Sequence, residues 1–152
     1  MIQADHLHLA INHSPLYAET FAFFLLLIGT IRRNGTLITT GLVMAIVAAL
    51  CGYAADWTGN GAADILQKAN IPGVDTQAIG LHDEAATFVL ISGSITAAAA
   101  IVALWWGRRG TRPRWLEIVL IVLALWSVSV TVRVALLGGR IHHPEVRAVV
   151  RG

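Results

Sequence analysis

The feature that most constrains the fold of this chain is a series of four long apolar runs with almost no charged residues inside them. They lie at about 14–31, 36–55, 82–106 and 115–137. Apolar runs of roughly 18 or more residues are long enough to cross a bilayer as α-helices. Only 13% of the 152 residues are charged, against about 25% in soluble domains. The sequence therefore predicts an all-α membrane protein formed by a single domain of four transmembrane helices.

The connections between the runs predict how the helices are arranged. Short polar turns, at 32–35 and 107–114, join the first run to the second and the third to the fourth, which is typical of antiparallel neighbours in an up-down bundle. The longer connection, 56–81, is rich in Gly, Asp and Asn and is expected to be a surface loop, with a short helix on the membrane face at 62–69. Ser14 followed by Pro15 predicts an N-cap and the first helical position of helix 1.

Small residues on the second run predict how the helices pack. Gly41, Ala45, either Ala48 or Ala49, and Gly52 recur at helical spacing. Small side chains let helices approach each other closely in lipid. We expect this stripe to face the interior of the bundle.

The placement of the basic residues predicts the orientation. Both short turns are rich in arginine, whereas the long connection and the two ends of the chain carry fewer basic residues and most of the acids. Because basic loops stay in the cytoplasm, we expect both termini and the loop 56–81 in the periplasm of a bacterial inner membrane. The same bias accounts for the net charge of +2 without a nucleic-acid partner.

All six histidines fall at the predicted periplasmic end. Counting 1.5 Å per residue from the arginine turns also places Asp56 and Arg133 near that boundary. Neutral imidazole is the commonest ligand for haem iron, copper and zinc. The candidate cofactor ligands are His13, His82, His142 and His143, with Arg133 available to haem propionates or as an interfacial cation, and Asp56 joining the same histidines in a metal site. His6 and His8 are interpreted as solvated residues at a helix mouth.

Two further observations narrow the chemistry. Cys51 is the only cysteine, so covalent haem attachment and iron–sulfur ligation within the chain are excluded. None of the usual hydrolase, kinase or dinucleotide-binding motifs is present, which favours an electron carrier or complex subunit over a stand-alone enzyme.

Glu19 lies inside the first run, where an ionisable group is costly. It is expected to be protonated, paired with Arg133, or part of a proton or quinone path.

Several segments carry a resemblance to a known family. NHSPLYAETFAF, GYAAD, the histidine that opens the third run and the closing GGRIHH together resemble the bacterial membrane family known as domain of unknown function 2231 (DUF2231). The resemblance covers most of the chain and implies a four-helix protein. By position it marks His13, Pro15, Gly52, Asp56, His82 and His142 or His143. Some relatives accompany Rieske-type modules, which implies a redox context. The chain departs from the family pattern at Ser14 and in its doubled His142–His143.

Three functions follow as alternatives. The first is a small cytochrome that binds haem b through histidines of different helices and passes electrons from a membrane quinol to a periplasmic redox protein. The second is a non-haem site for copper, zinc or iron, which the position of the histidines at helix mouths favours. The third is a structural accessory subunit of a respiratory complex, present as a homodimer or within a larger assembly.

The orientation is tested by thiol labelling in a variant that lacks Cys51. A cysteine introduced by Gly73→Cys should react with a membrane-impermeant reagent added to the periplasm, because it lies in the long loop. A cysteine introduced by Gly110→Cys should not, because it lies in an arginine turn. The reverse pattern would overturn the orientation.

Overall fold

The computed structural model describes residues 4–69, 76–110 and 112–142, and all of its regular elements in these ranges are helices. They are α1 (Ala4–Ile11), α2 (Ser14–Arg32), α3 (Gly35–Ala69), α4 (Thr76–Arg108) and α5 (Arg114–His142). Four stretches of the described chain are long and apolar enough to cross a membrane: Leu7–Arg32, Gly35–Gly61, Ile79–Arg108 and Arg114–Gly139. The prediction of an all-α protein with four helices able to span a bilayer is confirmed.

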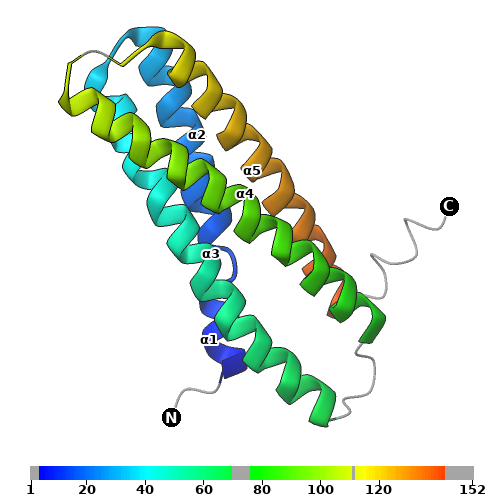
Figure 1. The fold of residues 1–152 in the computed structure, drawn as a ribbon. Helices are drawn as coiled ribbons and strands as arrows, with labels where there is room; N and C mark the ends of the chain where they lie inside the picture. The colour runs from blue at the N-terminus through cyan, green and yellow to red at the C-terminus, as the bar shows by residue number, and fades with distance from the viewer. Residues whose placement is uncertain (1–3, 70–75, 111, 143–152) are drawn as a thin grey trace, which may run out of the picture.

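The four long helices pack side by side, and the short helix α1 lies against α3 (Figure 1). Helix α2 packs against α3 and α5, and α4 packs against the same two helices. Each long helix therefore has two neighbours, as in an up-down bundle. This arrangement brings the first and last long helices of the chain into contact.

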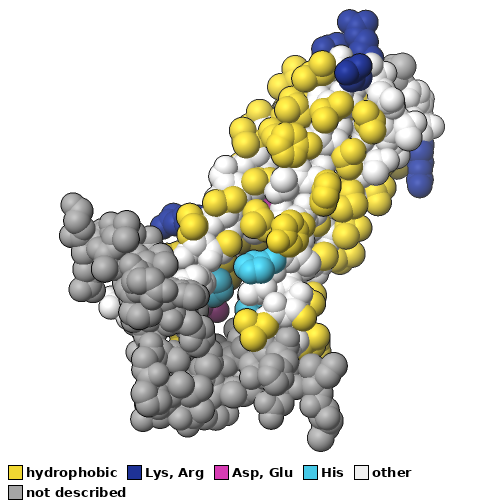
Figure 2. Space-filling view, turned by 180° about the vertical axis from the view of Figure 1, so that it is seen from behind, with side chains coloured by type: hydrophobic (Ala, Val, Ile, Leu, Met, Phe, Trp, Pro, Cys, Tyr) yellow, Lys and Arg dark blue, Asp and Glu magenta, His cyan; other side chains and the backbone are white. Residues whose placement is uncertain are grey.

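The surface and the interior of the bundle differ in residue size. Large apolar side chains such as Phe21, Leu50 and Leu136 are more than 60% exposed, and Figure 2 shows apolar side chains over much of one face. The interior holds many small residues, among them Ala22, Ala45, Ala100 and Ala124. Outward-facing apolar side chains with small residues between the helices suit a bundle surrounded by lipid.

The turn between α2 and α3 is stabilised by its own hydrogen bonds. Arg33 adopts a left-handed conformation with a φ of 52°, and the N–H of Asn34 donates to the carbonyl of Gly29 at 2.8 Å. The Asn34 side-chain oxygen then accepts the N–H of Thr36 at 3.0 Å. One asparagine thus helps to close α2 and caps α3.

The two arginine turns lie at the same end of the bundle. Arg112, between α4 and α5, donates from its guanidinium to Thr39 Oγ1 on α3 at 3.3 Å. The Arg109 guanidinium lies 3.8 Å from the centre of the Trp105 ring. This end is therefore cationic and aromatic, which is typical of a membrane interface.

Glycines allow α2 and α3 to approach closely. A Cβ at Gly29 would lie 2.8 Å from the backbone nitrogen of Ile38, and one at Gly41 would lie 2.9 Å from Leu26 Cγ. The predicted small-residue stripe of α3 is buried at Gly41, Ala45, Ala48 and Gly52. Its expected position inside the bundle is confirmed.

The structure corrects the predicted boundaries. The segment 56–81 was expected to be a loop, but α3 continues to Ala69 and α4 begins at Thr76; residues 70–75 lie outside the described chain. The first part of this continuation is contacted by α1, which was not predicted, at Ala55, Thr58 and Gly59. Local propensity is only a weak preference against such packing.

The predicted N-cap of the first long helix was also wrong. Its N-cap is His13 rather than Ser14. The Ser14 hydroxyl instead donates to the carbonyl of Ile11 at 2.7 Å and so binds α2 to the end of α1.

The contact at Gly29 predicts a sensitive position. Gly29→Ala should destabilise the bundle by about 1–3 kcal/mol, because the new methyl group meets backbone that has little room to move. Unfolding in mixed detergent micelles measures the change. Gly35→Ala is the matched control, since a Cβ there meets nothing within 4 Å. Equal stability of the two variants would contradict the close approach.

Candidate functional site

Two histidines at the end opposite the arginine turns are held in the same way by neighbouring helices. His8 on α1 places Nδ1 3.1 Å from the carbonyl oxygen of Ala55 and 3.3 Å from Thr58 Oγ1, both on α3. Its ring lies against Gly59, where a Cβ would be only 3.1 Å from His8 Cε1. Glycine at this position lets the imidazole rest on the backbone of α3.

His82 on α4 repeats this arrangement on α5. Its Nδ1 lies 3.1 Å from the carbonyl oxygen of Val134. A Cβ at Gly138 would lie 3.1 Å from His82 Cε1. Both rings are half-buried, and each depends on a glycine of the helix that it contacts.

The hydrogen bonds determine which ring nitrogen carries a proton. A backbone carbonyl only accepts hydrogen bonds, so Nδ1 of His8 and Nδ1 of His82 must be the donors. In the neutral ring this leaves the lone pair on Nε2. Histidines that bind metals usually donate their other N–H to a carbonyl or carboxylate in this way. Both rings are thus oriented as ligands are.

The third described histidine, His13, lies at the junction of α1 and α2. Its side chain is exposed. Figure 2 shows the described histidine side chains gathered toward one end of the bundle, next to a hollow. We call His8, His13 and His82 the histidine cluster. It draws residues from α1, α4 and the turn before α2.

The other predicted site residues take no part in the hydrogen bonds that hold His8 and His82. Arg133 is exposed on α5, and Asp56 on α3 is half-buried and accepts a hydrogen bond from Asn60 at 3.4 Å. His142 is the last residue of α5, but its side chain and all of His143 lie outside the described part of the structure. Among the described side chains, no three His, Cys, Asp or Glu residues form a group that would hold a metal ion. His13, His82 and Asp56 are therefore not brought together as one ligand set.

Sequence reasoning missed His8 because it did not predict α1. Without a helix over Ala4–Ile11, His8 reads as a solvated residue before the first run. A helix there carries it to the surface of α3, beside Gly59. That glycine, next to Thr58 at the end of an apolar run, was the available signal.

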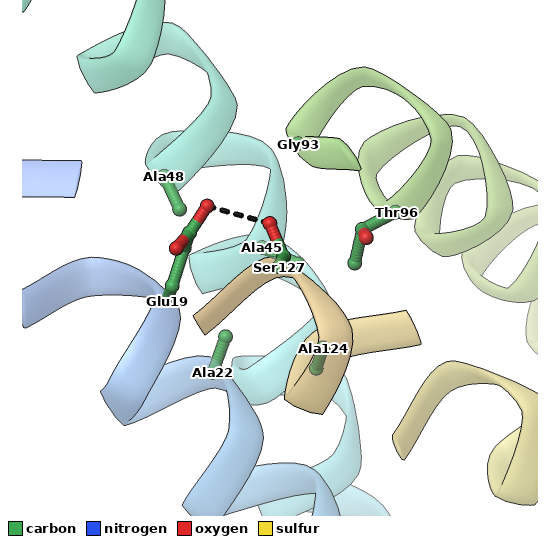
Figure 3. A pocket seen from close by; sticks show the side chains of 8 residues that line it. All are labelled: Glu19, Ala22, Ala45, Ala48, Gly93, Thr96, Ala124 and Ser127. Carbon is green, nitrogen blue, oxygen red and sulfur yellow. Dashed lines mark hydrogen bonds between the residues drawn. The ribbon is translucent and has the colours of Figure 1, made fainter. Parts of the chain in front are cut away.

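Glu19 has a different partner from the one expected. Its side chain is only 4% exposed, and its Oε1 accepts a hydrogen bond from the hydroxyl of Ser127 on α5 at 2.6 Å. Arg133, its expected partner, is exposed instead. One oxygen of the carboxyl group thus accepts a hydrogen bond from a neutral hydroxyl rather than from a cationic side chain (Figure 3).

Comparison with known proteins adds no identification. No family model, curated protein or solved structure matches the chain. The interpretation of the site therefore depends on its own geometry.

The histidine geometry predicts an order of chemical reactivity. Diethyl pyrocarbonate should modify His13 faster than His82, because His13 is exposed whereas His82 is half-buried and hydrogen-bonded. Gly138→Val should displace the His82 ring and speed its modification. Gly139→Val is the control, since a Cβ there meets nothing within 4 Å. Peptide mass spectrometry measures both rates, and equal rates for the two histidines in the parent protein would contradict the packing of His82.

Proposed function

We propose that the chain is a small multi-pass protein of the bacterial inner membrane that binds haem b at the histidine cluster and carries electrons. The observation that carries the proposal is the shared anchoring of His8 and His82. Each ring donates Nδ1–H to a backbone carbonyl of a neighbouring helix, so Nε2 of each ring would be available to a haem iron. The two ligands then come from different helices, as in other haem-binding bundles.

The donor set fits haem better than another metal. A haem iron held by two imidazoles needs only two protein ligands, whereas structural and catalytic zinc sites use at least three. The described residues contain no group of three such ligands. Among the described side chains, a pair of imidazoles therefore meets the ligand count of haem iron but not that of zinc. His13, the exposed member of the cluster, is the alternative partner of His82, and the predicted ligands His142 and His143 remain part of the proposal.

The surrounding residues would fix the ligands and balance charge. The carbonyls of Ala55 and Val134 orient the rings and raise their basicity as ligands. Arg133 is an exposed cation on α5, the helix whose Val134 carbonyl accepts the hydrogen bond from His82. It would be available to the haem propionates. Bound haem would supply one-electron chemistry.

The setting in the cell belongs to the same proposal. With the arginine turns in the cytoplasm, the histidine cluster would face the periplasm, where a membrane quinol would give electrons and a periplasmic redox protein would accept them. No family model matches the chain, and a relationship to the DUF2231 family, some of whose members accompany Rieske-type modules, stays part of this proposal because it would imply a redox context. The exposed apolar helix faces also leave room for a second copy or a larger complex.

The proposal is tested by absorption spectra of the detergent-purified protein, oxidised and reduced with dithionite. We expect a Soret band and sharp reduced α and β bands, typical of low-spin haem with two imidazole ligands. His82→Gly should lose this spectrum, and added imidazole should restore it by filling the vacated position. Asp83→Asn, at the adjacent exposed position, is the control and should keep the parent spectrum.

The second ligand is identified by comparing His8→Ala with His13→Ala. Loss of the low-spin bands in His8→Ala alone would support the His8–His82 pair, and loss in His13→Ala alone would replace His8 by His13. Protein expressed with ample haem that shows no Soret band would reject haem binding. Metal analysis of that protein would then separate a directly bound metal from a structural subunit.

A further inference from the structure

The end of the bundle opposite the histidine cluster carries an unbalanced positive charge. At this end the α2–α3 connection lies beside the end of α4 and the start of α5 (Figure 1). The segments 32–35 and 105–117 contain one acidic residue, Glu117, and six arginines: Arg32, Arg33, Arg108, Arg109, Arg112 and Arg114. Six positive charges and one negative charge give these segments a net charge of +5. We call this the arginine end, and its field attracts anions.

The described residues do not neutralise this charge. The partners of Arg109 and Arg112 are uncharged: the Arg109 guanidinium lies over the Trp105 ring, and Arg112 donates to the hydroxyl of Thr39. No arginine of this end forms an ion pair with a carboxylate in the ranges that the structure describes. The arginine end therefore keeps its capacity to bind a negatively charged group.

Arg112 is held in a fixed position between α3 and α4. Its Nη1 and Nη2 atoms donate to Thr39 Oγ1 on α3 at 3.4 and 3.3 Å. A Cβ at Gly107, in the last turn of α4, would lie 3.3 Å from Nη1 and 3.4 Å from Cζ. Glycine at this position thus makes room for the guanidinium, and Arg112 is half-buried. A side chain that is already ordered loses less conformational entropy when it binds a ligand.

The bonds to Thr39 use only part of the hydrogen-bonding capacity of Arg112. A guanidinium carries further N–H donors in the same plane. Two such donors match the spacing of two phosphate oxygens and form parallel charge-assisted hydrogen bonds with them. The Thr39 side chain is exposed, so the site opens at the surface of the bundle. Its geometry and its charge both suit a phosphate group.

Tryptophans place this site at the level of the lipid headgroups. Trp105 and Trp115 are 52% and 58% exposed, and the rings of Trp106 and Trp115 meet edge to face with their centres 6.3 Å apart. Exposed tryptophans are enriched where the hydrocarbon meets the headgroups. Val43, one turn beyond Thr39 on α3, is 46% exposed. Apolar surface for an acyl chain therefore begins directly beside the phosphate site.

We propose that Arg112, held by Thr39 and Gly107, binds the phosphate group of one anionic phospholipid in the leaflet at the arginine end. Basic sites between transmembrane helices bind anionic lipid headgroups in this way. The other arginines add a field that disfavours a headgroup with an ammonium group, so the lipid is anionic rather than zwitterionic. The site depends neither on haem binding nor on which side of the membrane this end faces.

Native mass spectrometry of the full-length protein in detergent, titrated with phosphatidylglycerol or phosphatidylethanolamine, tests the proposal. The first phosphatidylglycerol should bind more tightly than the first phosphatidylethanolamine. Arg112→Gln should weaken the binding of phosphatidylglycerol about tenfold, as expected for the loss of hydrogen bonds to a charged group. Arg33→Gln is the control of equal charge, because Arg33 is an exposed residue of the α2–α3 turn, and it should weaken binding much less.

The Thr39 variants test the site without changing any charge, and they apply even if Arg112→Gln does not fold. Thr39→Val removes the hydroxyl that holds Arg112 and should weaken phosphatidylglycerol binding several-fold, whereas Thr39→Ser should retain it.

Equal affinity for the two lipids would overturn the proposal. Equal losses in Arg112→Gln and Arg33→Gln would also overturn it, because they would indicate diffuse attraction rather than a site. Displacement of the bound lipid by excess inorganic phosphate would assign the site to free phosphate instead.

Discussion

Helices in lipid must satisfy their backbone hydrogen bonds internally, and they gain little from burying apolar side chains against one another. What holds such a bundle together is close contact, and in this chain glycine and alanine provide it. Gly29 and Gly41 let α2 and α3 approach until an added methyl group would collide with Ile38 or Leu26. The polar groups of the interior depend on this contact, because a looser bundle would not bring hydroxyls from α4 and α5 to a carboxyl group on α2.

The histidine cluster uses the same principle at the end of the bundle. His8 lies on Gly59 across the α1–α3 contact, and His82 lies on Gly138 across the α4–α5 contact. In both places the missing side chain makes room for an imidazole, and the carbonyl of a residue a few positions earlier accepts its Nδ1–H. The repetition on two separate helix pairs is what distinguishes these histidines from solvated residues at a helix mouth.

The sequence predicted those parts of the structure that depend on local pattern. The length of the apolar runs indicated four helices able to span a membrane, and the polar residues 32–35 indicated a tight turn. The spacing of small residues indicated the buried stripe of α3. The rest depends on contacts between distant segments. Helix α3 continues through Gly- and Asn-containing sequence, and His8 gains its partners on α3 only through the packing of α1 against it. Likewise Ser127 stands 108 residues from Glu19, and no local pattern relates the two.

The same separation has a consequence for how the protein is made. Of the four long helices, α2 emerges from the ribosome first and α5 last, so Glu19 is made before the Ser127 hydroxyl that donates to it. Until α5 arrives, the carboxyl group faces lipid or incomplete neighbours, where a charge is costly. Insertion of the first long helix therefore favours the neutral acid, and arrival of the last helix supplies the Ser127 hydroxyl that donates to it. Assembly of the bundle, rather than insertion of one helix, completes this hydrogen bond.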